Sequence, residues 1–146
     1  MIDFYNVLTK EEVILFSLRA LYKSYGFSKY SMSKFEEYDL YANNKDFLVS
    51  ENVITFTDTN GKLLALKPDV TLSIVKNSRD INGIMKVYYD ENVYRISKGT
   101  KSYKEIMQSG LECIGNVDKD VIVEVLSLAI LSLKEISNSN VLVISH

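Results

Sequence analysis

The chain has 146 residues, of which 47% are apolar and 25% are charged, and its formal net charge is −2. These values are typical of one globular domain with its own core, here residues 1–146. The slightly negative charge argues against binding nucleic acid through its phosphates. No run of about 20 apolar residues is present to span a membrane. The N-terminal stretch lacks the apolar region of a signal peptide, so we expect a cytoplasmic protein.

Several kinds of active site are excluded by the residues that the chain lacks. His146 is the only histidine and Cys113 the only cysteine. A Ser-His-Asp triad, a Cys-His pair or a histidine-rich zinc site needs a histidine inside the fold. The two common glycine-rich phosphate loops are also missing. Function must therefore depend on carboxylates, amides, hydroxyls and a few arginines, and we predict neither a metal site nor a cofactor.

The first half of the chain predicts a helix followed by extended segments. Thr9 and Glu12 form a capping box at the start of a helix that Gly26 ends. Residues 28–41 read as an extended segment that runs into a short helical turn. Residues 52–67 read as two strands around an Asn-Gly turn, which tolerates a positive φ. Pro68 suits the first position of the next helix, because proline has no amide to leave unpaired.

The second half predicts further strands and a long helix. The expected elements are two strands with a hairpin turn at 90–92, a loop at 98–102, a third strand at 103–115, a well-buried helix capped by Asp118, and a final strand at 140–145. Together these elements predict an α+β fold in which helices flank a mostly antiparallel sheet.

Five polar residues outline a candidate binding site. Gln108 and Glu112 are four apart in one strand and should share a face, Arg95 lies in the preceding strand, and Asp69 and Thr71 follow a strand-to-helix junction. Carboxylate, amide and hydroxyl groups suit an ammonium ion, and an arginine suits a carboxylate or a phosphate. On residue types alone, a solvated sheet face is the more common explanation of such a pattern. Thr71 as a helix cap, or Arg95 paired with an acidic neighbour, also stays open.

The order of three motifs resembles the histidyl-tRNA synthetases. "LALKPDVTLSIVK" resembles their Lys/Arg-Pro-Asp/Glu-x-Thr segment, and "VYYDENVYRI" and "YKEIMQSGLECIG" resemble the two halves of motif 2 of class II synthetases. The similarity covers about residues 10 to 145 and implies a class II aminoacyl-tRNA synthetase-like fold. It further implies that Asp69 and Thr71 hold the α-ammonium of histidine, Gln108 its head group and Glu112 its imidazole. Arg95 matches the arginine that touches the α-phosphate of ATP.

The departures from that pattern favour a non-catalytic relative. Ser97 stands where the enzymes have a glutamate, and residues 1–146 contain no motif 3, so we expect an incomplete adenylation site. Asp69 and "PDVTLSI" resemble the regulatory subunit of ATP phosphoribosyltransferase. The resemblance implies a regulatory role in histidine biosynthesis, with a short-form catalytic subunit as partner and L-histidine as ligand. The alternative is the N-terminal part of a histidyl-tRNA synthetase catalytic domain, which activates histidine with ATP.

The missing motif 3 half also has a structural consequence. Without its strands, one edge of the sheet would lie open and invite pairing with another chain. We therefore expect either a fragment of a longer protein or an assembly, as a homodimer or a larger hetero-oligomer.

Overall fold

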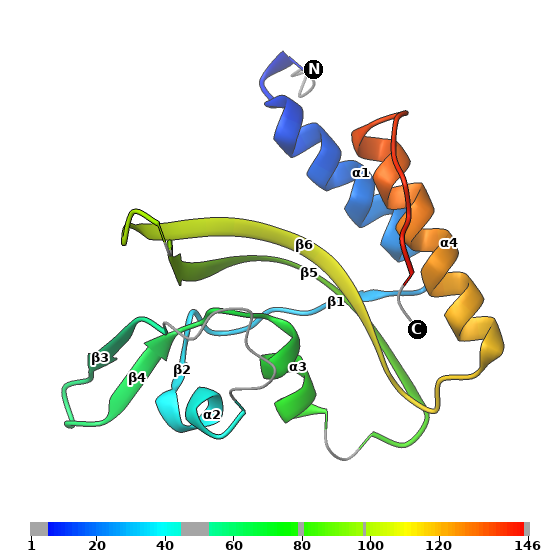
Figure 1. Cartoon of the computed structure of the whole chain (residues 1–146). Helices are drawn as coiled ribbons and strands as arrows, with labels where there is room; N and C mark the ends of the chain where they lie inside the picture. The colour runs from blue at the N-terminus through cyan, green and yellow to red at the C-terminus, as the bar shows by residue number, and fades with distance from the viewer. Residues whose placement is uncertain (1–5, 45–52, 79–80, 98, 145–146) are drawn as a thin grey trace. The chain divides into compact units, whose positions relative to one another are not determined.

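The computed structural model describes residues 6–44, 53–78, 81–97 and 99–144, and it has the predicted α+β architecture (Figure 1). The chain forms two compact units. The first comprises Met1–Lys29, Ile81–Tyr88 and Leu111–His146, and the second comprises Tyr30–Asp80 and Tyr89–Gly110. Among the described residues, no helix has the length and apolar character needed to cross a membrane.

Helix α1 (Lys10–Ser24) begins and ends in the first unit as its sequence predicts. The Thr9 amide donates to the Glu12 carboxylate at 2.8 Å, and the Glu12 amide donates to the Thr9 hydroxyl at 3.2 Å. These two bonds form the predicted capping box. At the other end Gly26 has a φ of +81°. The Gly26 amide donates to Lys23 at 3.0 Å and the Phe27 amide to Tyr22 at 3.1 Å, which is a Schellman ending.

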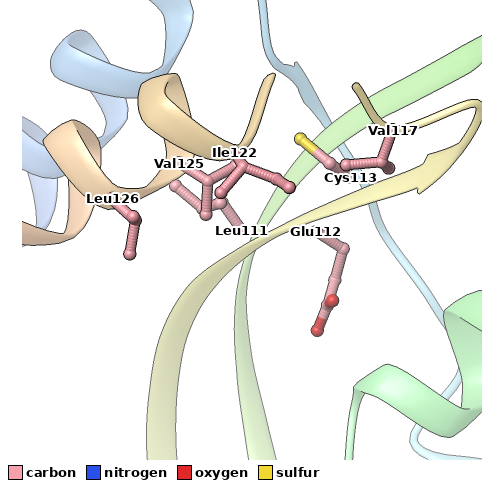
Figure 2. A pocket seen from close by; sticks show the side chains of 7 residues that line it. All are labelled: Leu111, Glu112, Cys113, Val117, Ile122, Val125 and Leu126. Atoms are coloured by element: carbon pink, nitrogen blue, oxygen red, sulfur yellow. The ribbon is translucent and has the colours of Figure 1, made fainter. Parts of the chain in front are cut away.

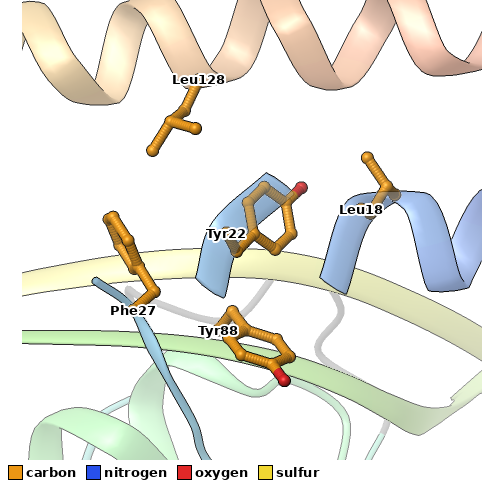
Figure 3. Packing of buried hydrophobic residues seen from close by; sticks show 5 residues of the cluster. All are labelled: Leu18, Tyr22, Phe27, Tyr88 and Leu128. Carbon is orange, nitrogen blue, oxygen red and sulfur yellow. The ribbon is translucent and has the colours of Figure 1, made fainter. Parts of the chain in front are cut away.

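The core of the first unit lies between α1, α4 (Lys119–Ile136) and the start of β5 (Ile84–Ile96). Figure 3 shows the buried residues that meet there, Leu18, Tyr22, Phe27, Tyr88 and Leu128. The Tyr22 hydroxyl also lies 3.0 Å from that of Ser132, which joins the two helices by a polar contact. The predicted cap is confirmed, since the Val121 amide donates to the Asp118 carboxylate at 3.0 Å.

The prediction that α4 is well buried is wrong for this chain. Of its residues, Val121 and Leu128 are buried, whereas Ile122 is 49% and Val123 62% exposed. A helix that is apolar nearly all round has more than one apolar face, and packing against α1 and β5 covers only one of them.

Strand β5 is one continuous strand, so the predicted hairpin turn at 90–92 is also wrong. The sheet order is β1-β5-β6, with β1 (Ser28–Lys29) parallel to β5 and β6 (Tyr103–Gly115) as predicted. The polar residues that suggested a turn have partners beside the strand instead. Asp90 accepts from Ser109 at 2.9 Å, Asn92 donates to Glu105, and Glu91 pairs with Lys67. Of the predicted loop at 98–102, residue 98 lies outside the described residues and residues 99–102 form no helix or strand. The short connection from β5 to β6 makes this pair of strands antiparallel.

The second unit contains a three-stranded antiparallel sheet in the order β2-β4-β3. Its strands are β2 (Phe35–Glu37), β3 (Thr55–Thr57) and β4 (Leu63–Leu66). The predicted turn is confirmed, because Gly61 has a φ of +81° and the Asp58 carboxylate accepts the amides of Asn60 and Lys62 at 2.8 Å. The short helix α2 (Tyr38–Ala42) follows β2, and Tyr41, Ala65 and Leu72 form the core of this unit.

Two further boundaries differ from prediction. Helix α3 (Thr71–Asn77) begins three residues after Pro68. The proline therefore lies in the connection between β4 and α3 and is not the first residue of the helix. Residues 140–144 form no strand, and Val141 and Val143 are 82% and 84% exposed. A segment with high strand propensity, such as residues 140–144, forms a strand only where a neighbouring strand pairs with it.

The uneven burial of α4 can be tested by replacing single side chains with alanine. Leu128→Ala removes a fully buried side chain and should lower the free energy of unfolding by about 2–5 kcal/mol. Val123→Ala removes an exposed side chain on the same helix and should change it by less than about 0.5 kcal/mol. Urea denaturation followed by circular dichroism measures both. Equal losses for the two variants would contradict the packing described for the first unit.

Candidate functional site

The junction between β4 and α3 places the predicted site residues Asp69 and Thr71. Lys67 and Pro68 are buried as the chain leaves the sheet, and Asp69 and Thr71 are half-buried. The Asp69 carboxylate accepts the Leu72 amide at 3.2 Å and so satisfies one of the free amides in the first turn of α3. The capping role considered for Thr71 therefore belongs to Asp69.

A cavity of about 460 Å³ lies at this junction in the second unit. Its walls are formed by Asn44, Asp69, Thr71, Leu72 and Val75. The set combines one carboxylate, one amide and one hydroxyl with two apolar side chains. Because one carboxylate oxygen of Asp69 is bonded to Leu72, the other can still accept from a ligand. This composition suits a small molecule that carries an ammonium group beside an apolar part.

Arg95 on β5 is bonded directly to this junction. Its Nε atom donates to the Pro68 carbonyl oxygen at 3.0 Å. A guanidinium has five N–H donors in a fixed plane, so this one bond sets the orientation of the group and leaves further donors for an anion. Arg95 does not form the hairpin pair with Glu91 that the sequence left open, because Glu91 binds Lys67 instead.

Gln108 and Glu112 are both on β6, but they belong to different units. Gln108 lies half-buried in the second unit with Asp69, Thr71 and Arg95, whereas Glu112 belongs to the first. Between them, Gly110 leaves room for the Tyr89 ring: a Cβ atom on Gly110 would lie 2.6 Å from the Tyr89 hydroxyl oxygen. Any larger residue at this position of the Gln-x-Gly-x-Glu motif would require the Tyr89 ring to move.

Glu112 lines a second cavity, of about 270 Å³, in the first unit (Figure 2). The other walls are Leu111, Cys113, Val117, Ile122, Val125 and Leu126. Figure 2 shows the Glu112 carboxylate pointing away from the apolar side chains of α4. Burial raises the pKa of the Cys113 thiol, so this cysteine packs as a small apolar side chain and is a weak nucleophile near pH 7.

Lys67, Glu91 and Asn44 are parts of the junction that the sequence prediction missed. The Lys67 side chain is fully buried, and its Nζ atom lies 3.1 Å from the Glu91 carboxylate. The burial of Lys67 could have been predicted from the alternation of side chains along β4, because Ala65 and residue 67 share the buried face of the strand. Asn44 carried no local signal, because only the tertiary fold brings the end of α2 to the junction.

Tyr41 lies fully buried behind the junction, and no described residue gives its hydroxyl a hydrogen bond of ordinary geometry. Burial raises the pKa of Tyr41 well above its usual range, the Ser73 hydroxyl offsets part of the rise, and the carboxylates of Glu36 and Asp69 add to it. The Glu36 carboxylate in turn accepts from Ser73 at 3.1 Å and pairs with Lys76 at 3.3 Å.

The sequence motifs and the α+β fold define a class II aminoacyl-tRNA synthetase-like protein. A family model described as histidyl-tRNA synthetase matches residues 7–146. The chain therefore belongs to the histidyl-tRNA synthetase family.

Relatives of two kinds share this family. The ATP phosphoribosyltransferase regulatory subunit of Clostridium novyi (strain NT) is 35% identical over 132 residues, which are 84% of this chain and 30% of that protein. The histidine–tRNA ligase of Methanococcus maripaludis (strain C7) is 28% identical over 144 residues, which are 95% of this chain and 34% of that protein. The chain thus spans about a third of the length of these curated relatives.

A solved structure has the same fold. A chain of the ATP phosphoribosyl transferase (HisG:HisZ) complex from Thermotoga maritima is 25% identical and superposes with a TM-score of 0.62. The match covers 92% of this chain and 43% of that chain.

Tyr41 predicts a pH dependence of stability. The folded-state pKa of Tyr41 is raised, so the folded state keeps the phenol neutral while the unfolded state ionises near pH 10. Its contribution to stability is complete below pH 10 and is lost as the pH rises above it. Urea midpoints measured from pH 8 to pH 11 should fall more steeply for the wild type than for Tyr41→Phe. Parallel curves would show that Tyr41 is not buried as described.

Proposed function

We propose that the chain is part of a non-catalytic regulatory subunit of ATP phosphoribosyltransferase, which acts in histidine biosynthesis. The observation that carries the proposal is the similarity to the Clostridium novyi protein of that name, joined to the cavity at Asp69 and Thr71. Its partner is the short-form catalytic subunit of the transferase. The Thermotoga maritima structure supports this choice, because it is a complex of the transferase that contains a chain of the same fold.

The ligand of the cavity is L-histidine. An ammonium group donates three hydrogen bonds, and the Asp69 carboxylate and the Thr71 hydroxyl supply two acceptors in the cavity wall. We assign the head group of the ligand to Gln108 and its carboxylate to Arg95, which belong to the same unit as the cavity. The imidazole contact of Glu112 stays a prediction of the family resemblance. Binding shifts the equilibrium between two states of the complex by as much as the affinities for the two states differ. No bond is made or broken in this account.

Two features favour regulation over catalysis. Arg95, at the position of the ATP-binding arginine, already uses its Nε atom to hold the Pro68 carbonyl. Ser97 replaces a carboxylate of the enzyme motif. The second candidate function is the N-terminal part of a histidyl-tRNA synthetase, and the similarity to the Methanococcus maripaludis ligase over 95% of this chain favours it.

The test is the rate of a short-form ATP phosphoribosyltransferase catalytic subunit with and without this protein, across a titration with L-histidine. We expect activation that L-histidine reverses. Thr71→Val removes one hydroxyl acceptor and should shift the inhibitory histidine concentration upward by about tenfold, the equivalent of one lost hydrogen bond of about 1.4 kcal/mol. Thr57→Val, an exposed threonine on β3, is the matched control and should leave the curve unchanged.

Two outcomes would count against the proposal. The same rate with and without the protein at every histidine concentration would exclude the regulatory function. Binding of ATP with magnesium by the same sample would then support the synthetase candidate.

A further inference from the structure

Three consecutive residues at the junction are held by hydrogen bonds from several segments of the second unit. The Lys67 amide donates to the Lys34 carbonyl at 3.1 Å, and the Lys67 carbonyl accepts the Tyr94 amide at 2.9 Å. The Pro68 carbonyl accepts from Arg95 at 3.0 Å, and the Asp69 carboxylate caps α3. The path of the chain into the cavity wall is therefore set by β5 on one side and by the segment before β2 on the other.

The Lys67 side chain is the unusual member of this set. It has 0% exposure, and its Nζ atom pairs with the carboxylate of Glu91, whose side chain is 17% exposed. Removing an ammonium from water is expensive, and a buried ion pair often stabilises a fold no more than apolar residues of the same volume do. Stability alone therefore gives little reason for a lysine here.

Geometry gives a better reason. An apolar side chain at residue 67 would make no directional bond to β5, whereas the ion pair attaches Nζ to one carboxylate of that strand. Lys67 is bonded to β5 through its main chain at Tyr94 and through its side chain at Glu91, three residues apart on that strand. These two attachments fix both the position and the rotation of residue 67. Because the ring of Pro68 fixes its φ angle, they also constrain the position of Asp69.

We propose that Lys67 and Glu91 are positioning residues for the cavity: their buried ion pair holds the junction so that Asp69 and Thr71 present their oxygens to the ligand. Neither residue touches the ligand in this account. The inference rests on the proposed function for the identity of the ligand, L-histidine, but the placement of Asp69 can be measured without any ligand.

The test compares three variants with the wild type. Lys67→Met/Glu91→Gln removes both charges together, so it leaves no unpaired buried charge and should fold. Lys67→Arg keeps the cation and is the conservative rescue. Lys62→Met breaks the exposed pair between Lys62 and Glu37, whose side chains are each 54% exposed, and is the matched control.

The first readout is hydrogen exchange of the Leu72 amide, which the Asp69 carboxylate protects. In the double variant this amide should exchange about tenfold faster, the equivalent of about 1.4 kcal/mol of lost protection. The Val121 amide has the same kind of bond, to Asp118 in the first unit, and should be unchanged. Lys67→Arg and Lys62→Met should both leave Leu72 protected.

The second readout is the affinity for L-histidine by calorimetry, which should fall about tenfold in the double variant and recover in Lys67→Arg. Wild-type Leu72 protection and wild-type affinity in a folded double variant would overturn the inference, because the pair would then be a stability element only. If the wild type itself binds no L-histidine, the proposed function fails, and Leu72 exchange alone decides the positioning role.

Discussion

The connection from β4 to α3 is constrained by the burial of a charged residue. Lys67 must lie inside the second unit, since its strand alternation places it beside Ala65, and its ammonium then requires the Glu91 carboxylate. Because Glu91 belongs to the middle of β5, this strand cannot turn at 90–92 without leaving the lysine unpaired. One electrostatic requirement thus accounts for both the continuity of β5 at residues 90–92 and the fixed entry of the chain into the cavity wall.

The sequence predicted those elements whose signals are local. The Thr9–Glu12 capping box, the Schellman glycine and the Asp58–Gly61 turn each satisfy their own backbone groups within a few residues, and all three formed as expected. Predictions failed where a partner distant in sequence decides. Asp90 and Asn92 have turn propensity, but Ser109 and Glu105 bind them across the strand pair. Asn44 and Glu91 became part of the junction only through tertiary contacts.

Three of the predicted site residues line cavities, Asp69 and Thr71 in the second unit and Glu112 in the first, and the two cavities differ in chemistry. The junction cavity combines Asp69, Thr71 and Asn44 with apolar walls, and it provides the acceptors that an amino acid's ammonium needs. The cavity beside α4 is lined mainly by apolar side chains, with Glu112 pointing away from them. The residue types in the motif predicted a binding site, whereas the lining of each cavity and the bond from Arg95 to Pro68 required the structure.

The most direct measurement is the amide NMR spectrum of the isotope-labelled chain during a titration with L-histidine. The central claim is that the junction cavity binds an amino acid through Asp69 and Thr71. It predicts saturable shifts at Asn44, Thr71 and Leu72, with residues of α1 unaffected. The same titration with imidazole alone, which lacks the ammonium, should leave these three amides in place. Shifts confined to α1 and α4, or no shifts at millimolar L-histidine, would contradict the claim.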